Sequence, residues 1–232
     1  MTIRRALICD KWEFPIIDGQ SGFFKHTNIS ELSRRAICFE WLIDGVPKDK
    51  TVTEYFGGIG LQSVIIQNSM KPSRHSIFDI DPDCISQIAS LYQDTEAVKV
   101  ELQDAKEIMG TSDDDVIILD FPNMTAKHYS EWAEPLAAVF SKHPKLVEIT
   151  DVGNRYLHLH RNLYSVLLGN NVDTIPDYIE AISRYLYSLY GYSVIKAAYK
   201  SGTSYMFLGE TEPQTPDMLH VTSNPSGFRY IE

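Results

Sequence analysis

The sequence predicts an α/β protein with a doubly wound, mostly parallel sheet, an antiparallel C-terminal β-hairpin at its edge and a helical N-terminal extension. Two observations predict this class. Between residues 51 and 149, short apolar runs typical of strands alternate with stretches of helical spacing, which is the pattern of right-handed βαβ crossovers. After Gly191, two strand-like runs follow each other with only a turn between them, which is the pattern of a hairpin.

Three parts of the chain differ in pattern. Residues 1–50 are predicted to be an N-terminal extension, irregular as far as residue 28 and then helical from 29 to 44. Asn28 and Glu31 have the spacing of a capping box, and Gly45 with Pro47 ends the helix. Residues 51–210 are the main domain, and residues 211–232 are an extended tail with three prolines.

The main domain contains five predicted strands before the hairpin, followed by one more helix. The strands are 52–56, 75–80, 97–102, 116–119 and 146–149. The fourth has four apolar residues in a row, as expected of a strand covered on both faces. Helical stretches follow Gly60 and Pro82, and another covers 126–142, where Pro135 is expected to break or bend it. A last helix runs from Thr174 to Gly191, before hairpin strands 193–199 and 204–208.

Composition and charge exclude some classes of protein. The 232 residues are 44% hydrophobic and 22% charged, which is ordinary globular composition. No apolar run has membrane-spanning length and no signal-peptide pattern is present, so we expect a cytoplasmic protein. The scattered Cys9, Cys38 and Cys84 form neither a disulfide framework nor a C-x-x-C metal pair, and no metal site is predicted.

The negative charge is concentrated in one stretch. Residues 51–120 hold 4 Lys/Arg and 13 Asp/Glu, a net charge of −9 out of −10 for the whole chain. Proteins that bind long nucleic acids non-specifically usually carry a basic footprint, and this sequence does not. Four arginines, at positions 4, 5, 34 and 35, form either a local basic patch or simply a solvated surface.

The stretch Val52–Leu61, V-T-E-Y-F-G-G-I-G-L, joins the first strand to the helix after it. Glycines at 57, 58 and 60 allow positive φ angles and let a ligand approach the backbone, while the helix start offers free N–H groups. An ordinary glycine turn is the alternative, because such motifs also occur without function.

Acidic residues follow three later strands. The stretches are F-D-I-D-P at 78–82, L-Q-D-A at 102–105 and D-F-P-N at 120–123. Open α/β sheets bind ligands at the carboxyl ends of their strands, so these residues are candidates for one site. As alternatives, residues 79–82 form a turn with a helix N-cap, and Asp104 caps the short helix after it.

The order of these four stretches resembles the class I S-adenosylmethionine-dependent methyltransferases over about residues 50–210. The resemblance implies a seven-stranded sheet with a reversed last strand and S-adenosyl-L-methionine as cofactor. In that family's pattern Glu54 serves the ammonium group, Asp79 (with Asp81 second) the ribose hydroxyls, and Asp104 the adenine amino group. The cofactor-binding residues that the resemblance implies are Glu54, Phe56, Gly57, Gly58, Gly60, Asp79, Ile80, Asp104 and Ala105.

Residues 120–123 resemble the D/N-P-P-aromatic motif of methyltransferases that modify exocyclic amines of nucleobases and glutamine amides. The resemblance implies that Asp120, Pro122 and Asn123 are catalytic and hold the amine that receives the methyl group. The motif differs at two places, since residue 121 is Phe instead of Pro and residue 123 is Asn instead of an aromatic. A ring to stack on a base would therefore come from Phe121 or Tyr129.

Three functions remain open at this point. The favoured one is methyl transfer to an amine nitrogen of a nucleic acid base. The second is methyl transfer to a protein or a small molecule, which the acidic charge permits, and the third is a methyltransferase-like module that binds a partner without turnover. The stretch 151–168 contains His158 and His160, but no third metal ligand is evident nearby, so a substrate-facing loop or a surface helix is the preferred interpretation.

Overall fold

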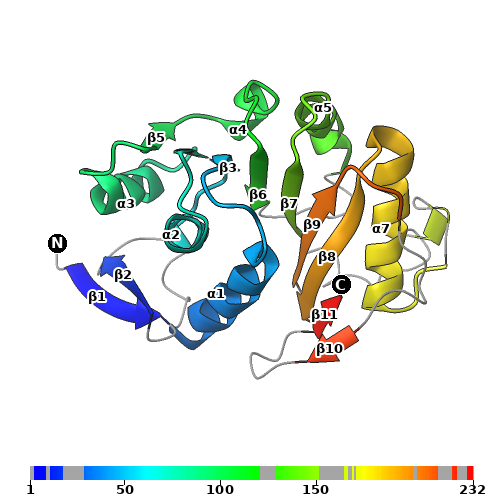
Figure 1. Ribbon diagram of the computed structural model, residues 1–232, viewed down its shortest axis with the longest axis horizontal. Coiled ribbons are helices and arrows are strands. Elements are labelled where there is room, and N and C mark those ends of the chain that lie inside the picture. Colours follow the sequence, from blue (N-terminus) through cyan, green and yellow to red (C-terminus); the bar gives the residue numbers. More distant parts are fainter. Residues whose placement is uncertain are drawn as a thin grey trace. The chain divides into compact units, whose positions relative to one another are not determined.

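The computed structural model describes residues 3–8, 11–17, 29–120, 129–151, 165–166, 169, 171–200, 203–213, 221–223 and 229–231. The chain divides into two compact units, Met1–Ala105 and Lys106–Glu232 (Figure 1).

The first unit begins with a hairpin. β1 (Ile3–Ile8) and β2 (Trp12–Ile17) pair antiparallel as a two-stranded sheet. The prediction of an irregular stretch was therefore wrong here, and Pro15 explains part of the error. Proline usually argues against a strand, yet Pro15 of β2 pairs in register with Arg5 of β1. A two-stranded sheet has only edge strands, and proline is tolerated there.

The helix predicted at 29–44 is confirmed as α1 (Ile29–Ile43), whereas Asn28 of the predicted capping box lies outside the described residues. Ala36, Phe39 and Leu42 of α1 are buried at helical spacing, which is the stripe expected of a core-facing helix.

Three parallel strands carry the rest of the first unit. β3 (Thr51–Tyr55) pairs with β4 (Arg74–Asp79), and β4 pairs with β5 (Val98–Leu102). The crossovers contain α2 (Leu61–Ser69) and α3 (Pro82–Tyr92). Because the strands are parallel, their carboxyl ends meet at one edge, where the register places Tyr55 beside Phe78 and Asp79 beside Leu102.

The second unit contains the predicted hairpin. β6 (Val116–Asp120) and β7 (Leu146–Asp151) are parallel, β9 (Thr203–Gly209) pairs antiparallel with β7, and β8 (Ser193–Lys200) pairs antiparallel with β9. Together with β3, β4 and β5, these are the seven strands that the resemblance implied. The mostly parallel α/β architecture with an antiparallel hairpin is thus confirmed (Figure 1).

Two details of the second unit differ from expectation. The tail, which was predicted to be extended, contains two strands, β10 (Val221–Ser223) and β11 (Arg229–Ile231). They pair with each other, and β11 also pairs with β8. Pro135 lies inside α5 (Tyr129–Phe140), which continues through it. The buried Trp132, Leu136 and Val139 of α5 supply packing that offsets the backbone hydrogen bond lost at a helical proline.

The last helix begins and ends as its sequence predicts. α7 (Ile175–Tyr190) starts at Thr174, which forms a capping box with Asp177, and ends at Gly191 in the left-handed region with φ 78°. Ile182 and Leu186 of α7 are buried, and α7 packs on β8 (Figure 1).

Candidate functional site

The glycine loop reverses the chain between β3 and α2 through several left-handed residues. Phe56 has φ 64°, Gly58 φ 52° and Gly60 φ 80°. A non-glycine residue in this region costs of order 1–3 kcal/mol, so Phe56 indicates a locally strained loop. Gly60 is the N-cap of α2 and provides no side-chain cap, which leaves the first N–H groups of the helix for another acceptor.

Two of the glycines have different tasks. A Cβ atom on Gly57 would lie 2.6 Å from the Ile77 side chain, so Gly57 allows the loop to pack closely on β4. A Cβ atom on Gly58 would meet nothing nearer than 3.8 Å, so Gly58 is required by its positive φ and has open space beside it.

Asp79 ends β4 and connects the glycine loop to the next turn. Its Oδ2 accepts a hydrogen bond of 2.8 Å from the N–H of Gly58, and its Oδ1 accepts one of 2.8 Å from the N–H of Asp81. A carboxylate has about four acceptor positions, so each oxygen can still accept a hydroxyl. Asp79 is half-buried, which keeps it rigid and within reach of a ligand.

Asp81 has the helix-capping role that was the alternative interpretation of this stretch. Its Oδ1 accepts a hydrogen bond of 2.8 Å from the N–H of Asp83, and Asp81 is the N-cap of α3, with Pro82 in the first turn. Its side chain is therefore engaged in stabilising α3.

Two large apolar side chains are exposed beside these carboxylates. Ile80 is 66% exposed and Leu102 is 54% exposed, at the carboxyl ends of β4 and β5. The N–H of Gln103 donates to the backbone oxygen of Asp79, which holds the two strand ends together. Asp104 is partly buried and directly precedes α4 (Ala105–Ile108), while the Ala105 side chain faces inward.

Glu54 is almost fully buried, at 1% exposure, in a polar network that sequence reasoning missed. The Ser63 hydroxyl donates to Glu54 Oε2 over 2.6 Å, and His75 Nε2 lies 3.1 Å from the same oxygen. Gln67 Nε2 lies 2.9 Å from His75 Nδ1. The available signal was spacing, because Ser63 and Gln67 are four residues apart on α2 and so share a face.

Cys84 of α3 is buried behind the acidic turn. Burial, together with the negative charges of Asp79 and Asp81, raises the pKa of its thiol to about 12. We expect iodoacetamide to leave Cys84 unlabelled at pH 8 in the folded protein, because the thiolate is about 1000-fold scarcer than in an exposed cysteine. Mass spectrometry of labelled peptides tests this, with urea-unfolded protein as the control. Rapid labelling in the native state would show that the turn does not bury the thiol.

Asp120 is the last residue of β6, is half-buried and is paired in register with Thr150 of β7. The other predicted catalytic residues, Pro122 and Asn123, lie outside the described residues, as do His158 and His160.

Strand β7 carries two buried carboxylates, Glu148 and Asp151, that the sequence analysis did not predict. Thr150 donates to Glu148 over 2.9 Å.

The second of these carboxylates belongs to Asp151, at the carboxyl end of β7. The Tyr178 hydroxyl of α7 donates to its Oδ2 over 2.6 Å, and both side chains are buried. This bond joins α7 to the end of the strand.

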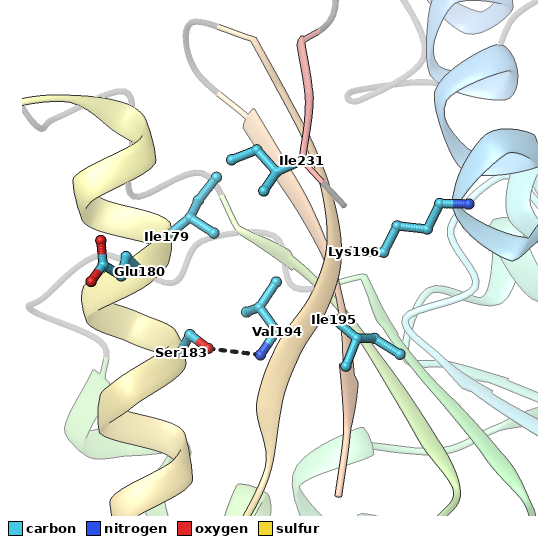
Figure 2. Close-up of a pocket in the computed structure, with 7 residues that line it drawn as sticks. All are labelled: Ile179, Glu180, Ser183, Val194, Ile195, Lys196 and Ile231. Carbon is cyan, nitrogen blue, oxygen red and sulfur yellow. Dashed lines mark hydrogen bonds between the residues drawn. The ribbon is translucent and has the colours of Figure 1, made fainter. Parts of the chain in front are cut away.

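A separate hollow lies between α7, β8 and β11 (Figure 2). Ile179, Val194 and Ile231 line it, and the N–H of Val194 donates to Ser183 Oγ over 2.9 Å. It adjoins the register shift between Val194 and Lys196, so it is a packing feature of an irregular strand.

Among the described residues no group of three possible metal ligands occurs. No helix among the described residues has the length and apolarity to cross a membrane.

No family model and no curated protein matches this chain. Solved structures do. The chain is similar to a putative RNA methyltransferase from Pyrococcus horikoshii, with 13% identity over 81% of this chain and 86% of that one and a TM-score of 0.53. It is similar to magnesium protoporphyrin IX methyltransferase from Synechocystis with bound SAH, with 14% identity, 84% and 90% coverage and a TM-score of 0.54.

A third similar structure is a putative methyltransferase from Escherichia coli, with 13% identity, 88% and 93% coverage and a TM-score of 0.52. At these identities the likeness shows the fold. The protein has a Rossmann-like α/β fold that is similar to the fold of these methyltransferase structures.

Proposed function

We propose that the protein is an S-adenosylmethionine-dependent methyltransferase that transfers a methyl group to an amine nitrogen, with a nucleic acid base as the favoured acceptor. One observation carries the cofactor part. The Asp79 carboxylate, at the end of β4 and beside the exposed Ile80, accepts one backbone hydrogen bond from Gly58 of the glycine loop and one from Asp81 in the following turn. In this fold, ligands bind at such strand ends.

The residues present fit the cofactor. A ribose offers two hydroxyls, and the Asp79 carboxylate has free acceptor positions on both oxygens. A purine ring needs an apolar face, which the 66% exposed Ile80 and the 54% exposed Leu102 provide. Asp104 is the candidate acceptor for the adenine amino group. The charge of −9 over residues 51–120, from 4 Lys/Arg and 13 Asp/Glu, suits a ligand with sulfonium and ammonium groups.

The bound cofactor would supply a methyl group on a positively charged sulfur, ready for displacement. The protein's own tasks are then to bind and to orient. Asp79, Asp104 and the Gly58 backbone hold the nucleoside, and Asp120 with Pro122 and Asn123 holds the acceptor amine. A hydrogen bond from the amine N–H to the Asp120 carboxylate aims the nitrogen lone pair, and such positioning accounts for much of the rate in a direct displacement.

Calorimetry tests the cofactor part. We expect S-adenosylmethionine to bind with a dissociation constant in the micromolar range, about −8 kcal/mol, because its nucleoside and its charges both have partners. NAD is the control ligand, since other Rossmann-like folds bind dinucleotides and this site has a different loop. An absence of heat at millimolar S-adenosylmethionine, in protein whose circular dichroism shows that it is folded, would remove the proposal.

The acceptor part needs a separate experiment. The similar structures include a putative RNA methyltransferase and a porphyrin methyltransferase, so acceptors differ among proteins with this fold. Transfer of tritium from labelled cofactor is measured into RNA, DNA, protein and a small-molecule extract. Label in nucleic acid supports the proposal, label in protein or in the extract favours the second function, and cofactor binding without any transfer favours a non-catalytic module. The net charge of −10 is the observation that favours methyl transfer to a protein or a small molecule as the second function.

A further inference from the structure

We propose that Ser63 and His75 are positioning residues that hold the buried Glu54 carboxylate in the orientation that recognises the ammonium group at the methionine end of the cofactor. The inference rests on the proposed function, and it adds two residues of this chain to the part of the site that reads the amino acid. Glu54 is on β3, two residues before the left-handed Phe56 that opens the glycine loop.

The contacts define one orientation of the carboxylate. Ser63 Oγ lies 2.6 Å and His75 Nε2 lies 3.1 Å from Oε2 of Glu54, and neither contact involves Oε1. The Ser63 hydroxyl is the donor in its bond, because an ionised carboxylate only accepts. Two donors on one oxygen fix the plane of the group and leave the second oxygen for a cation.

Gln67 determines which nitrogen of His75 carries the proton. Its side-chain Nε2 lies 2.9 Å from His75 Nδ1, so the amide donates to Nδ1. Nε2 then holds the proton that is shared with Glu54. His75 is fully buried at 0% exposure, so no water competes for either nitrogen.

The network also connects the site to the elements around it. Glu54 comes from β3, His75 from β4, and Ser63 and Gln67 from α2, whose first turn begins at Gly60 of the loop. A buried carboxylate needs hydrogen-bond partners, and Ser63 and His75 supply them, while Gln67 holds His75 in place. Removing one donor would let the carboxylate turn, and so weaken its contact with an ammonium group.

A purely structural role would have a different signature. If the network only held α2 on the sheet, a substitution would disturb the whole loop and weaken every ligand of the site. If it positions Glu54 for an ammonium group, only ligands that carry this group would be affected. S-adenosylhomocysteine carries the ammonium, whereas 5′-methylthioadenosine has the same nucleoside without the amino acid.

Calorimetry with these two ligands separates the roles. We expect Glu54→Gln to weaken S-adenosylhomocysteine by about 10- to 100-fold, the effect of losing a hydrogen bond to a charged group, and to leave methylthioadenosine within about two-fold. Ser63→Ala and His75→Leu should each weaken S-adenosylhomocysteine by about 5- to 10-fold, as expected for the loss of one orienting hydrogen bond. His75→Gln, which keeps an N–H donor, should restore most of that loss.

Tyr92→Phe is the matched control. The Tyr92 hydroxyl is buried, feels the negative charge of Glu54, and has no hydrogen-bond partner among the described residues, so its removal should change neither affinity. Equal weakening of both ligands in Ser63→Ala and His75→Leu would overturn the positioning role, as would unchanged affinity for S-adenosylhomocysteine. If His75→Leu does not fold, Ser63→Ala alone decides between these results. Failure of the parent protein to bind either ligand would instead reject the proposed function, and the positioning role with it.

Discussion

Asp79→Ala is expected to weaken binding of S-adenosylmethionine by about 10- to 100-fold, whereas Asp81→Ala is expected to change it by less than about two-fold. The two carboxylates are two residues apart, yet they have different partners. Asp79 accepts hydrogen bonds from Gly58 and from Asp81, so its loss removes the proposed acceptor for the ribose and also the contact that holds the glycine loop. Asp81 accepts from Asp83 at the start of α3, which is a local cap.

Each variant serves as the control for the other, because one is expected to change mainly the affinity for the cofactor and the other mainly the free energy of unfolding. Asp81→Ala should lower the free energy of unfolding by about 1 kcal/mol, the usual contribution of an N-cap, while it leaves cofactor binding intact. Calorimetry gives the affinities and urea unfolding gives the stabilities. Asp79→Asn should lie between the parent and Asp79→Ala, because an amide oxygen still accepts one hydrogen bond. Equal loss of affinity in Asp79→Ala and Asp81→Ala, or the reverse order, would show that the ribose acceptor is misassigned.

Much of the fold could be predicted because local chemistry determines it. The apolar run Val116–Leu119 is fully buried, and the Asp81-Pro82 start of α3 and the Gly191 end of α7 appear where capping and turn preferences place them. The strand ends were also predictable, since glycine and aspartate mark them in the sequence. These features depend on residues close together in the chain.

The rest depends on contacts between residues far apart in the sequence. The pairs Arg5–Pro15 and Arg229–Tyr199 form only because separate segments of the chain meet. The sequence around these residues shows no clear alternation of apolar and polar residues that would predict a strand. The network around Glu54 could not be predicted for the same reason. An isolated serine, glutamine and histidine read as surface residues, and only the packing of α2 over β3 and β4 brings them together around one buried carboxylate.

The largest effect on turnover is expected at Asp120. Asp120→Ala should lower the rate of methyl transfer by about 100-fold, because the loss of positioning alone can have this effect. Its affinity for S-adenosylmethionine should stay within about two-fold, since Asp120 belongs to the acceptor side of the proposed chemistry. Asp113→Ala is the control, because that aspartate is 79% exposed and pairs with Lys142. Tritium transfer to the acceptor fraction gives the rate, and calorimetry gives the affinity.

Asp120→Asn then distinguishes two chemical roles. If the side chain only orients an amine, the amide oxygen still accepts a hydrogen bond from the acceptor N–H, and part of the rate should remain. If Asp120→Asn is as inactive as Asp120→Ala, the carboxylate acts as a general base, and the acceptor is a hydroxyl or a charged amine that must lose a proton first. Parental rates in both variants would exclude Asp120 from the site. The position of Asp120 directly after the buried run Val116–Leu119 favours the orienting role, because an orienting group must be held still.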